Sequence, residues 1–333
     1  MHTLILSHAD VVRLLPMATC IDLMADALAA ASRGDAVLPL RQVMRLPNSP
    51  NAFGLMPALL GDALGAKVIT VFPDNASTPY ESHIGVVLYF ETTNGQLRAI
   101  IDASSITAIR TAAASGLATQ LLANKDASDL ALLGGGVQAL THLEAMMCAR
   151  RLKRVRVWSR SAERRAEFIR QAKLRLNVEA EESASPQDAV RDADLICTVT
   201  ASREPVLQGE WIRDGAHINA VGASQPTSRE LDSAAVVRSR MFVDRRESAR
   251  NEAGDFLAPR KEGAITDDHI LGEIGELVAG TIDGRRSERD VTLFKSLGLA
   301  VEDVACAAYL YKRAISEGAG QRIAIGGMRD GAH

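Results

Sequence analysis

The sequence is constrained most by a glycine-rich turn that joins an apolar run to a helix-like segment. Residues 130–140 read LALLGGGVQAL, which places Gly134, Gly136 and Ala139 in the spacing G-x-G-x-x-A. In a strand-to-helix turn the first glycine permits a tight bend, the second lets a pyrophosphate approach the backbone, and the small third residue lets the helix pack against the sheet. The turn therefore predicts a Rossmann unit that binds a dinucleotide. A turn that needs glycine only for its bend is the alternative.

Strand-like and helix-like segments alternate after this turn. Helices are expected to begin at Val137 and Ala162, and the apolar strand-like segments are 130–134, 155–159, 193–200 and 216–222. Strands separated by helices favour a parallel sheet with right-handed crossovers. The predicted fold class is therefore α/β, with a Rossmann-type doubly wound parallel sheet.

The N-terminal region has a helical pattern. Ser7 and Asp10 have the spacing of a capping box, and a second helix is expected from about Cys20 to Arg33, where Gly34 ends it. The region therefore begins with two helices.

The next region is rich in strand-forming residues. Apolar runs between residues 64 and 102 include a pair separated by Asn94-Gly95, which is a strong hairpin signal. An antiparallel sheet is expected here. A serine at position 104 or 105 is expected to cap an alanine-rich helix that ends near Asn124.

A last helix is expected within 296–318, where apolar residues recur at intervals of three and four. It lies beyond the Rossmann pattern. We therefore expect two domains: a Rossmann domain at 119–299, inserted into a second α+β domain made of 1–118 and 300–333.

Charge and composition exclude several classes of partner. The 333 residues include 38 Lys and Arg against 41 Asp and Glu, so no basic field attracts nucleic acid or anionic membranes. The apolar runs are too short for a membrane span, and the first residues lack the pattern of a secretory leader. We expect a cytoplasmic protein without nucleic-acid or membrane partners. Four cysteines and seven histidines show no metal-binding spacing, so no metal is expected.

The end of the second Rossmann strand bears on the choice of dinucleotide. An Asp or Glu at this position accepts hydrogen bonds from the ribose 2′-hydroxyl of NAD. This chain has Ser159, Arg160 and Ser161 there, so no carboxylate repels a 2′-phosphate and the arginine is suited to pair with one. NADP is the predicted cofactor, with NAD as the alternative. A solvated surface charge is the other interpretation of Arg160.

Three cations lie in surroundings where charge is costly. Arg41 and Arg110 have apolar or small neighbours, so each is expected either in a buried salt bridge or against an anionic ligand. The residues themselves leave both interpretations open. Lys67 precedes an apolar strand and is either a solvated lysine at the strand edge or a functional group.

Five further segments resemble one protein family. They are LPLRQVM at 38–44, GAKVITVFPDN at 65–75, ITAIRTAAASGLAT at 106–119, GAHINAVGASQPTSRELD at 215–232 and TLFKSLGLAVEDVA at 292–305. Their order and content resemble the family of ornithine cyclodeaminase and mu-crystallin. The likeness is greater to the mu-crystallin-like members, which include ketimine reductases.

The resemblance implies a homodimer whose substrate-binding and dimerisation domain is formed by both ends of the chain. Arg41, Lys67 and Arg110 are implied to face the substrate, with Lys67 and Arg110 as candidate catalytic residues. With the turn and the second strand, the candidate cofactor contacts are Ser82, His83, Thr111, Gly134, Gly135, Gly136, Val137, Gln138, Ser159, Arg160, Ser161, Thr198, Val199, Thr200, Val221, Ser224 and Lys295.

Ser224 bears on the type of reaction. Cyclodeaminases of this family carry an aspartate at this position, and a serine without an activating partner is not a general base at neutral pH. We therefore expect an NAD(P)H-dependent reductase of small cyclic imino acids, such as pyrroline-2-carboxylate or piperideine-2-carboxylate, that yields proline or pipecolate. A related possibility is an amino acid dehydrogenase. The alternatives are an ornithine cyclodeaminase and, in another class, a mu-crystallin-like protein that binds a small ligand.

Overall fold

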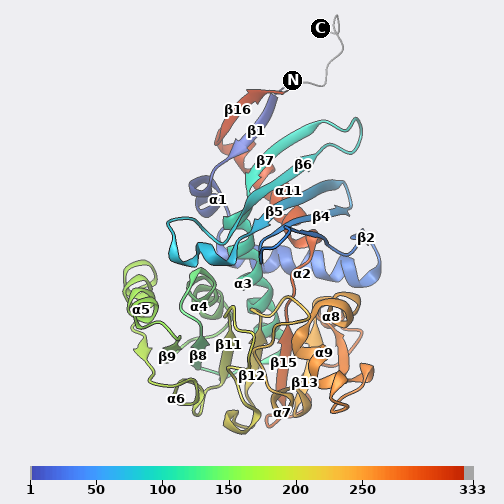
Figure 1. Ribbon diagram of the computed structural model, residues 1–333. Helices are drawn as coiled ribbons and strands as arrows, with labels where there is room; N and C mark the ends of the chain where they lie inside the picture. The colour runs from blue at the N-terminus through green and yellow to red at the C-terminus, as the bar shows by residue number, and fades with distance from the viewer. Residues whose placement is uncertain (1, 326–333) are drawn as a thin grey trace, which may run out of the picture. The chain divides into compact units, whose positions relative to one another are not determined.

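The computed structural model of the chain describes residues 2–325 and divides into two compact units (Figure 1). Unit 1 contains the residues up to Arg110 and those from Leu299 onward, and unit 2 is Thr111–Gly298. The chain enters unit 2 within the helix α3 (Ala103–Leu122). Both termini of the chain therefore contribute to unit 1.

Unit 1 contains an eight-stranded sheet. Its main path is β16-β1-β7-β6-β5-β4-β2, β3 pairs with β4, and all pairs are antiparallel except β1 with β7. The strands are β1 (His2–Leu6), β2 (Ala36–Val37), β3 (Gln42–Arg45), β4 (Ala52–Leu60), β5 (Ala63–Val71), β6 (His83–Phe90), β7 (Leu97–Asp102) and β16 (Gln321–Ala324).

Three helices accompany this sheet: α1 (His8–Leu14), α2 (Met17–Arg33) and α11 (Ala300–Glu317). The helix α11 packs on β4, β5 and β6 and also contacts α2. The capping box at Ser7 is confirmed, and α2 ends at Gly34, whose φ of 81° is left-handed, as expected. No single helix among the described residues is long and apolar enough to cross a membrane, although α1 and α2, with an 84° bend between them, satisfy that criterion as a pair.

The antiparallel arrangement expected within 64–102 is confirmed by β5, β6 and β7. Two details differ from the prediction. The hairpin loop spans residues 91–96, and only Gly95 has a positive φ, so Asn94-Gly95 is part of a longer loop. The expected serine cap of α3 is wrong, because the Asp102 carboxylate instead accepts a hydrogen bond from the Ser105 amide at 2.8 Å.

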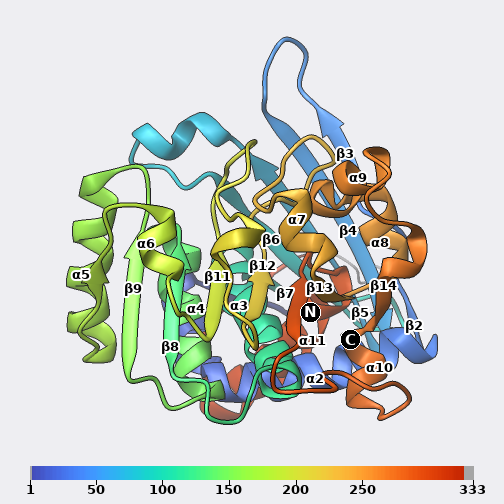
Figure 2. The same cartoon turned by 90° about the horizontal axis from the view of Figure 1, so that it is seen from below.

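Unit 2 contains an eight-stranded sheet in which every pair is parallel, with the order β10-β9-β8-β11-β12-β15-β13-β14 (Figure 2). Its strands are β8 (Asp129–Leu133), β9 (Arg154–Trp158), β10 (Glu181–Glu182), β11 (Leu195–Thr198), β12 (His217–Ala220), β13 (Ser239–Val243), β14 (Ile270–Glu273) and β15 (Val291–Lys295). The predicted α/β class and doubly wound parallel sheet are confirmed.

The helices of unit 2 connect these strands. They are α4 (Val137–Ala149), α5 (Ala162–Leu176), α6 (Pro186–Val190), α7 (Ser233–Val237), α8 (Arg246–Glu252), α9 (Gly254–Lys261) and α10 (Ile274–Val278). From β8 the chain first builds outward to β9 and β10 and then returns to add β11 on the other side. The order of strands therefore reverses between β8 and β11, and such a switch point is where open α/β sheets bind ligands, at the carboxyl ends of the strands.

Candidate functional site

Two cations and two carboxylates form a buried charge cluster in unit 1. Lys67 Nζ lies 2.8 Å from Asp303 Oδ2, Arg110 Nε lies 3.1 Å from Asp303 Oδ1, and Arg110 Nη1 lies 2.9 Å from Glu302 Oε2. Their side chains are at most 5% exposed. Of the two interpretations left open for Arg110, the structure contains the buried salt bridge. Its contact with a ligand stays a prediction.

The secondary structure explains how these charges meet. Every second residue of β5 is buried, so the strand period places Lys67 on the inner face, where α11 packs. Glu302 and Asp303 lie in the first turn of α11, where the helix dipole favours negative charge. Glu302 Oε1 also accepts a hydrogen bond from the Leu299 amide at 3.2 Å, which fixes the start of the helix.

The cluster changes the acidity of its members. Burial, together with the neighbouring charge of Arg110, lowers the pKa of Lys67 to about 8, although Asp303 opposes the shift. Burial alone would raise the pKa of Asp303, but Arg110 and Lys67 together hold that pKa below its ordinary value. Lys67 is therefore an ammonium that loses its proton just above neutral pH, a property suited to proton transfer.

The other predicted residues of unit 1 lie at strand ends. Arg41 immediately precedes β3, is partly buried, and its charge contributes to the lowered pKa of Lys67. Ser82 Oγ lies 3.0 Å from Nδ1 of His83, the first residue of β6. The structure thus brings Arg41, Lys67 and Arg110 into one electrostatic environment, while Ser82 and His83 form a hydrogen-bonded pair.

The glycine turn has the geometry of a phosphate-binding loop. Gly134 has a φ of 129°, and a Cβ there would lie 2.7 Å from the carbonyl oxygen of Val199. A Cβ on Gly136 would meet no atom within 4 Å, and Gly136 is the N-cap of α4, which has no side-chain cap. Ala139 is fully buried, as close packing of the helix requires. Open space at an uncapped helix N-terminus suits the pyrophosphate of a dinucleotide.

The residues around this turn differ in their surroundings. Gly135 lies against the backbone of Arg164, since a Cβ on it would be 3.1 Å from that carbonyl oxygen. Val137 is 61% exposed at the start of α4. The buried Oε1 atom of Gln138 has no hydrogen-bond partner within the described residues. Thr111, the first residue of unit 2, is buried in α3.

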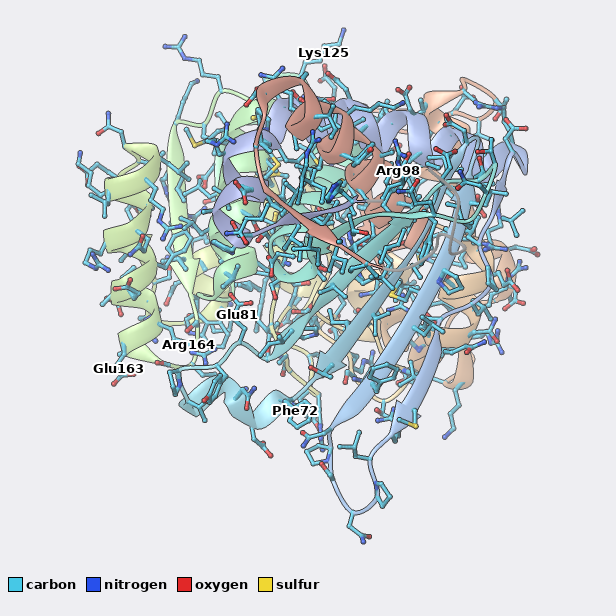
Figure 3. The ribbon with its side chains drawn as sticks, turned by 90° about the horizontal axis from the view of Figure 1, so that it is seen from above. Phe72, Glu81, Arg98, Lys125, Glu163 and Arg164 are labelled. Atoms are coloured by element: carbon cyan, nitrogen blue, oxygen red, sulfur yellow. The ribbon has the colours of Figure 1, made fainter. Side chains whose placement is uncertain are left out.

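The residues after β9 form the cap of α5. The Ser161 hydroxyl accepts a hydrogen bond from the Arg164 amide at 3.2 Å and donates one to Glu163 at 2.6 Å; Figure 3 labels Glu163 and Arg164 at this helix start. Ser159 is buried and donates to the Ser161 carbonyl oxygen. Arg160 between them is exposed and has no hydrogen bond or ion pair to any residue that the structure describes.

The loops after β11 and β12 contain most of the remaining candidates. Thr198 and Val221 are buried, while Val199, Thr200 and Ser224 are partly buried. They lie at the carboxyl ends of their strands, on the same sheet edge as the glycine turn.

Lys295 differs from the other cofactor candidates. It is fully buried, with Nζ 3.0 Å from Asp255 Oδ2 and 3.2 Å from the Ala220 carbonyl oxygen. The structure therefore gives its ammonium two protein partners in the core of unit 2, and a direct contact with the cofactor stays a prediction.

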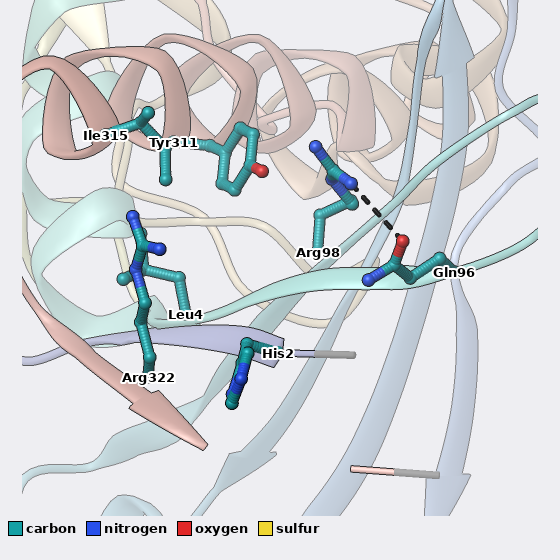
Figure 4. A pocket seen from close by; sticks show the side chains of 7 residues that line it. All are labelled: His2, Leu4, Gln96, Arg98, Tyr311, Ile315 and Arg322. Atoms are coloured by element: carbon teal, nitrogen blue, oxygen red, sulfur yellow. Dashed lines mark hydrogen bonds between the residues drawn. The ribbon is translucent and has the colours of Figure 1, made fainter. Parts of the chain in front are cut away.

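A cavity of about 250 Å³ in unit 1 contains none of the predicted site residues (Figure 4). It is lined by His2, Leu4, Gln96, Arg98, Tyr311, Ile315 and Arg322. Arg98 lies over the Tyr311 ring at 5.2 Å and donates to Gln96.

Among the described residues, the sequence analysis missed five buried carboxylates: Glu230, Asp244, Asp255, Glu302 and Asp303. The signal for the last two was present, because AVEDVACAA surrounds them with apolar residues, as AIRTAA surrounds Arg110. An acid in such surroundings needs a cationic or hydrogen-bonding partner. The sequence pattern carried no comparable sign for Glu230.

The sequence model of the ornithine cyclodeaminase/mu-crystallin family matches residues 1–318. The chain belongs to this family. The match covers both units except for the last part of unit 1, so the family resemblance predicted from five separate segments is confirmed.

Relatives in this family match nearly the whole chain. Ketimine reductase mu-crystallin of Mus musculus is 39% identical over 280 residues, 84% of this chain and 85% of that protein. The structure of Thermococcus litoralis Δ1-pyrroline-2-carboxylate reductase in complex with NADH and L-proline is 36% identical, with a TM-score of 0.94 over 96% of this chain and 100% of that one. An archaeal alanine dehydrogenase dimer with bound NAD is 30% identical, with a TM-score of 0.91 over 97% and 99% of the two chains.

Replacement of Arg110 by Met tests the buried charge cluster. The change leaves Glu302 and Asp303 with one cation fewer in a buried site, so the free energy of unfolding should fall by about 3–5 kcal/mol. Arg13→Met is the matched control in unit 1, because Arg13 pairs with Glu317 at the surface and its loss should cost about 0–1 kcal/mol. Denaturant unfolding measures both. Equal, small losses in the two variants would contradict a stabilising role of the cluster.

Proposed function

We propose that the protein is an NAD(P)H-dependent reductase of small cyclic imino acids, with pyrroline-2-carboxylate or piperideine-2-carboxylate as substrate and proline or pipecolate as product. The main support is the likeness, over 96% of this chain, to the pyrroline-2-carboxylate reductase that was crystallised with NADH and L-proline. The ketimine reductase mu-crystallin of mouse supports the same class of reaction. Ser224, in place of the aspartate of cyclodeaminases, favours reduction over cyclodeamination.

The charge cluster of unit 1 is the proposed substrate site. The cluster pairs the cations Lys67 and Arg110 with the carboxylates of Glu302 and Asp303, and the charge of Arg41 acts on Lys67 as well. These three cations are the groups proposed to form charge-assisted hydrogen bonds with the substrate carboxylate in a site screened from water. Arg110 has a second role in this proposal, since it holds Asp303 in place beside Lys67.

Lys67 is the proposed proton donor. Reduction of a C=N bond needs a hydride, which a bound nicotinamide supplies, and a proton at nitrogen. The Lys67 ammonium, with a pKa of about 8, releases a proton more readily than an exposed lysine. Asp303 at 2.8 Å limits how far the ammonium moves and favours its charged form.

Unit 2 is the proposed dinucleotide domain and unit 1 the proposed substrate and dimerisation domain. The open space at Gly136 and the uncapped start of α4 suit a pyrophosphate. Exposed Arg160 supports a preference for NADP, since its guanidinium has no hydrogen-bond or ion-pair partner among residues 2–325 to give up in order to bind a 2′-phosphate.

A homodimer is the proposed assembly. The residues of β4, β5 and β6 that alternate with the buried ones are apolar yet only partly buried; they include Phe53, Leu55, Leu64, Val68, Val86 and Leu88. An apolar sheet face of this kind is typical of a protein interface. The related alanine dehydrogenase is a dimer.

The reaction itself is tested with the purified protein and a panel of substrates. NADPH or NADH should be consumed with a five- or six-membered cyclic imino acid, and absorbance at the reduced nicotinamide band measures it. Release of ammonia and proline from ornithine with only catalytic NAD would instead identify a cyclodeaminase.

The role of Lys67 is tested by the pH dependence of the rate at saturating substrate. The donor is the ammonium, which exists below its pKa, so kcat should fall as pH rises through about 8. Lys67→Met should lower kcat and abolish this fall of kcat with rising pH, which is the alkaline limb of the profile. Lys125→Met, which removes an exposed lysine labelled in Figure 3, should leave the profile unchanged. An unaltered limb in the Lys67 variant would assign the proton to another group.

The cofactor preference is tested by Arg160→Asp. Loss of a charge-assisted contact worth about 1.5–3 kcal/mol should weaken NADPH use by roughly 10- to 100-fold and leave NADH use much less affected. Arg151→Asp makes the same charge change at an exposed position before β9, at the opposite end of that strand, and should alter neither. Equal effects on the two cofactors, or a wild-type preference for NADH, would remove Arg160 from the 2′-phosphate site.

A further inference from the structure

One buried carboxylate in unit 2 joins the loops that follow β11 and β12. Glu230 Oε2 accepts hydrogen bonds from Thr198 Oγ1 at 2.9 Å and from the Gly222 amide at 2.7 Å. Glu230 Oε1 accepts from the Thr200 amide at 2.6 Å and from Thr200 Oγ1 at 2.7 Å. Three of the four donors belong to the two loops, the fourth is Thr198 at the end of β11, and both oxygen atoms of the carboxylate are used.

The two loops are also packed directly against each other. The Val221 amide donates to the Thr198 carbonyl oxygen at 3.0 Å. A Cβ on Gly222 would lie 1.9 Å from the Thr200 carbonyl oxygen, so only glycine permits this approach. The spacing of the loops is therefore fixed at backbone level, and the hydrogen bonds of Glu230 to both loops add to this contact.

A second carboxylate and Lys295 hold Glu230 in place. Asp255 Oδ1 accepts hydrogen bonds from the amides of Glu230 at 2.7 Å and of Leu231 at 3.0 Å. Lys295 pairs with the other oxygen of Asp255 and donates to the Ala220 carbonyl oxygen at the end of β12. The network thus links the carboxyl ends of β11, β12 and β15.

Burial decides how Glu230 acts. Its side chain, like those of Asp255 and Lys295, is completely inaccessible to solvent, so it does not present a surface to a ligand. The end of β11 and the loops that it holds contain Thr198, Val199, Val221 and Ser224, all proposed cofactor contacts beside the switch point of the sheet. Removal of the Glu230 carboxylate would therefore loosen the loops without removing any atom that is proposed to contact the cofactor.

We infer that Glu230 is a positioning residue for dinucleotide binding: its carboxylate, held by Asp255 and Lys295, sets the spacing of the loops after β11 and β12. Lys295 thereby acts on the cofactor through the protein rather than by contact. The inference rests on the proposed dinucleotide function of unit 2.

The experiment compares Glu230→Gln with Asp194→Asn. Gln has the same shape but replaces one acceptor oxygen by an amide that repels the loop donors. Asp194 is the matched control, because it accepts hydrogen bonds from the amides of Ser128 and Asp129 at the amino end of β11, the end opposite to Thr198. Dinucleotide Kd is measured by fluorescence titration with NADH and NADPH, alongside Tm, cofactor KM, substrate KM and kcat.

Both variants should lower Tm, because each replaces a carboxylate that accepts hydrogen bonds from backbone amides, but only Glu230→Gln should raise the dinucleotide Kd and KM, by about 10-fold or more. Its kcat at saturating cofactor and its substrate KM should change much less. An unchanged dinucleotide Kd in the Glu230 variant, or an equal increase in the Asp194 variant, would overturn the inference.

Two further results complete the test. If Glu230→Gln does not fold, Asp255→Asn weakens the carboxylate that holds the Glu230 backbone, is not itself a proposed cofactor contact, and should raise the dinucleotide Kd by a smaller factor; an unchanged Kd would overturn the inference. Wild-type protein that binds neither NADH nor NADPH would overturn the proposed function as well. If the wild-type protein binds a dinucleotide and the Glu230 variant has the same dinucleotide Kd, only the inference is overturned and the proposed function stands.

Discussion

The ion pairs of Lys67 and Arg110 with the first turn of α11 are the interactions on which unit 1 depends. They join a strand and a helix from the first third of the chain to a helix near its end, across more than 190 residues of sequence for Arg110. Because all of unit 2 is inserted between these segments, the halves of unit 1 are held together by contacts rather than by chain continuity. A buried charge is costly unless it is paired, so each charged side chain of the cluster needs its oppositely charged partner.

The same principle operates in unit 2 on a different element. There the carboxyl ends of parallel strands need to be kept at fixed distances, and parallel strands provide no tight turns to do so. The network of Glu230, Asp255 and Lys295 supplies these connections through buried hydrogen bonds and an ion pair. In both units, buried carboxylates hold groups that are proposed to meet a ligand, and neither carboxylate set is exposed.

The predicted elements of the fold agree best with the structure where local sequence and tertiary environment require the same conformation. This holds for the glycine turn, for the strands β8, β9, β11 and β12, and for the helices α4 and α5. In each of them, the spacing of apolar residues and the residues that begin or end the element lie within a short segment. The strands β1–β4, β10 and β13–β16 were not predicted. The strands β1 and β16, from opposite ends of the chain, pair with each other, and no local sequence pattern indicates this pairing.

The candidate site was predicted from the sequence only in part. The sequence by itself determined the Rossmann turn, the absence of an acid after the second strand, and the family, because each depends on residue types at short spacings. Only the tertiary structure decided that Asp303 lies between Lys67 and Arg110, and that Lys295 faces Asp255 in the core. The reason is physical: burial and pairing of charges depend on contacts between residues far apart in sequence, and such contacts exist only after the chain has folded.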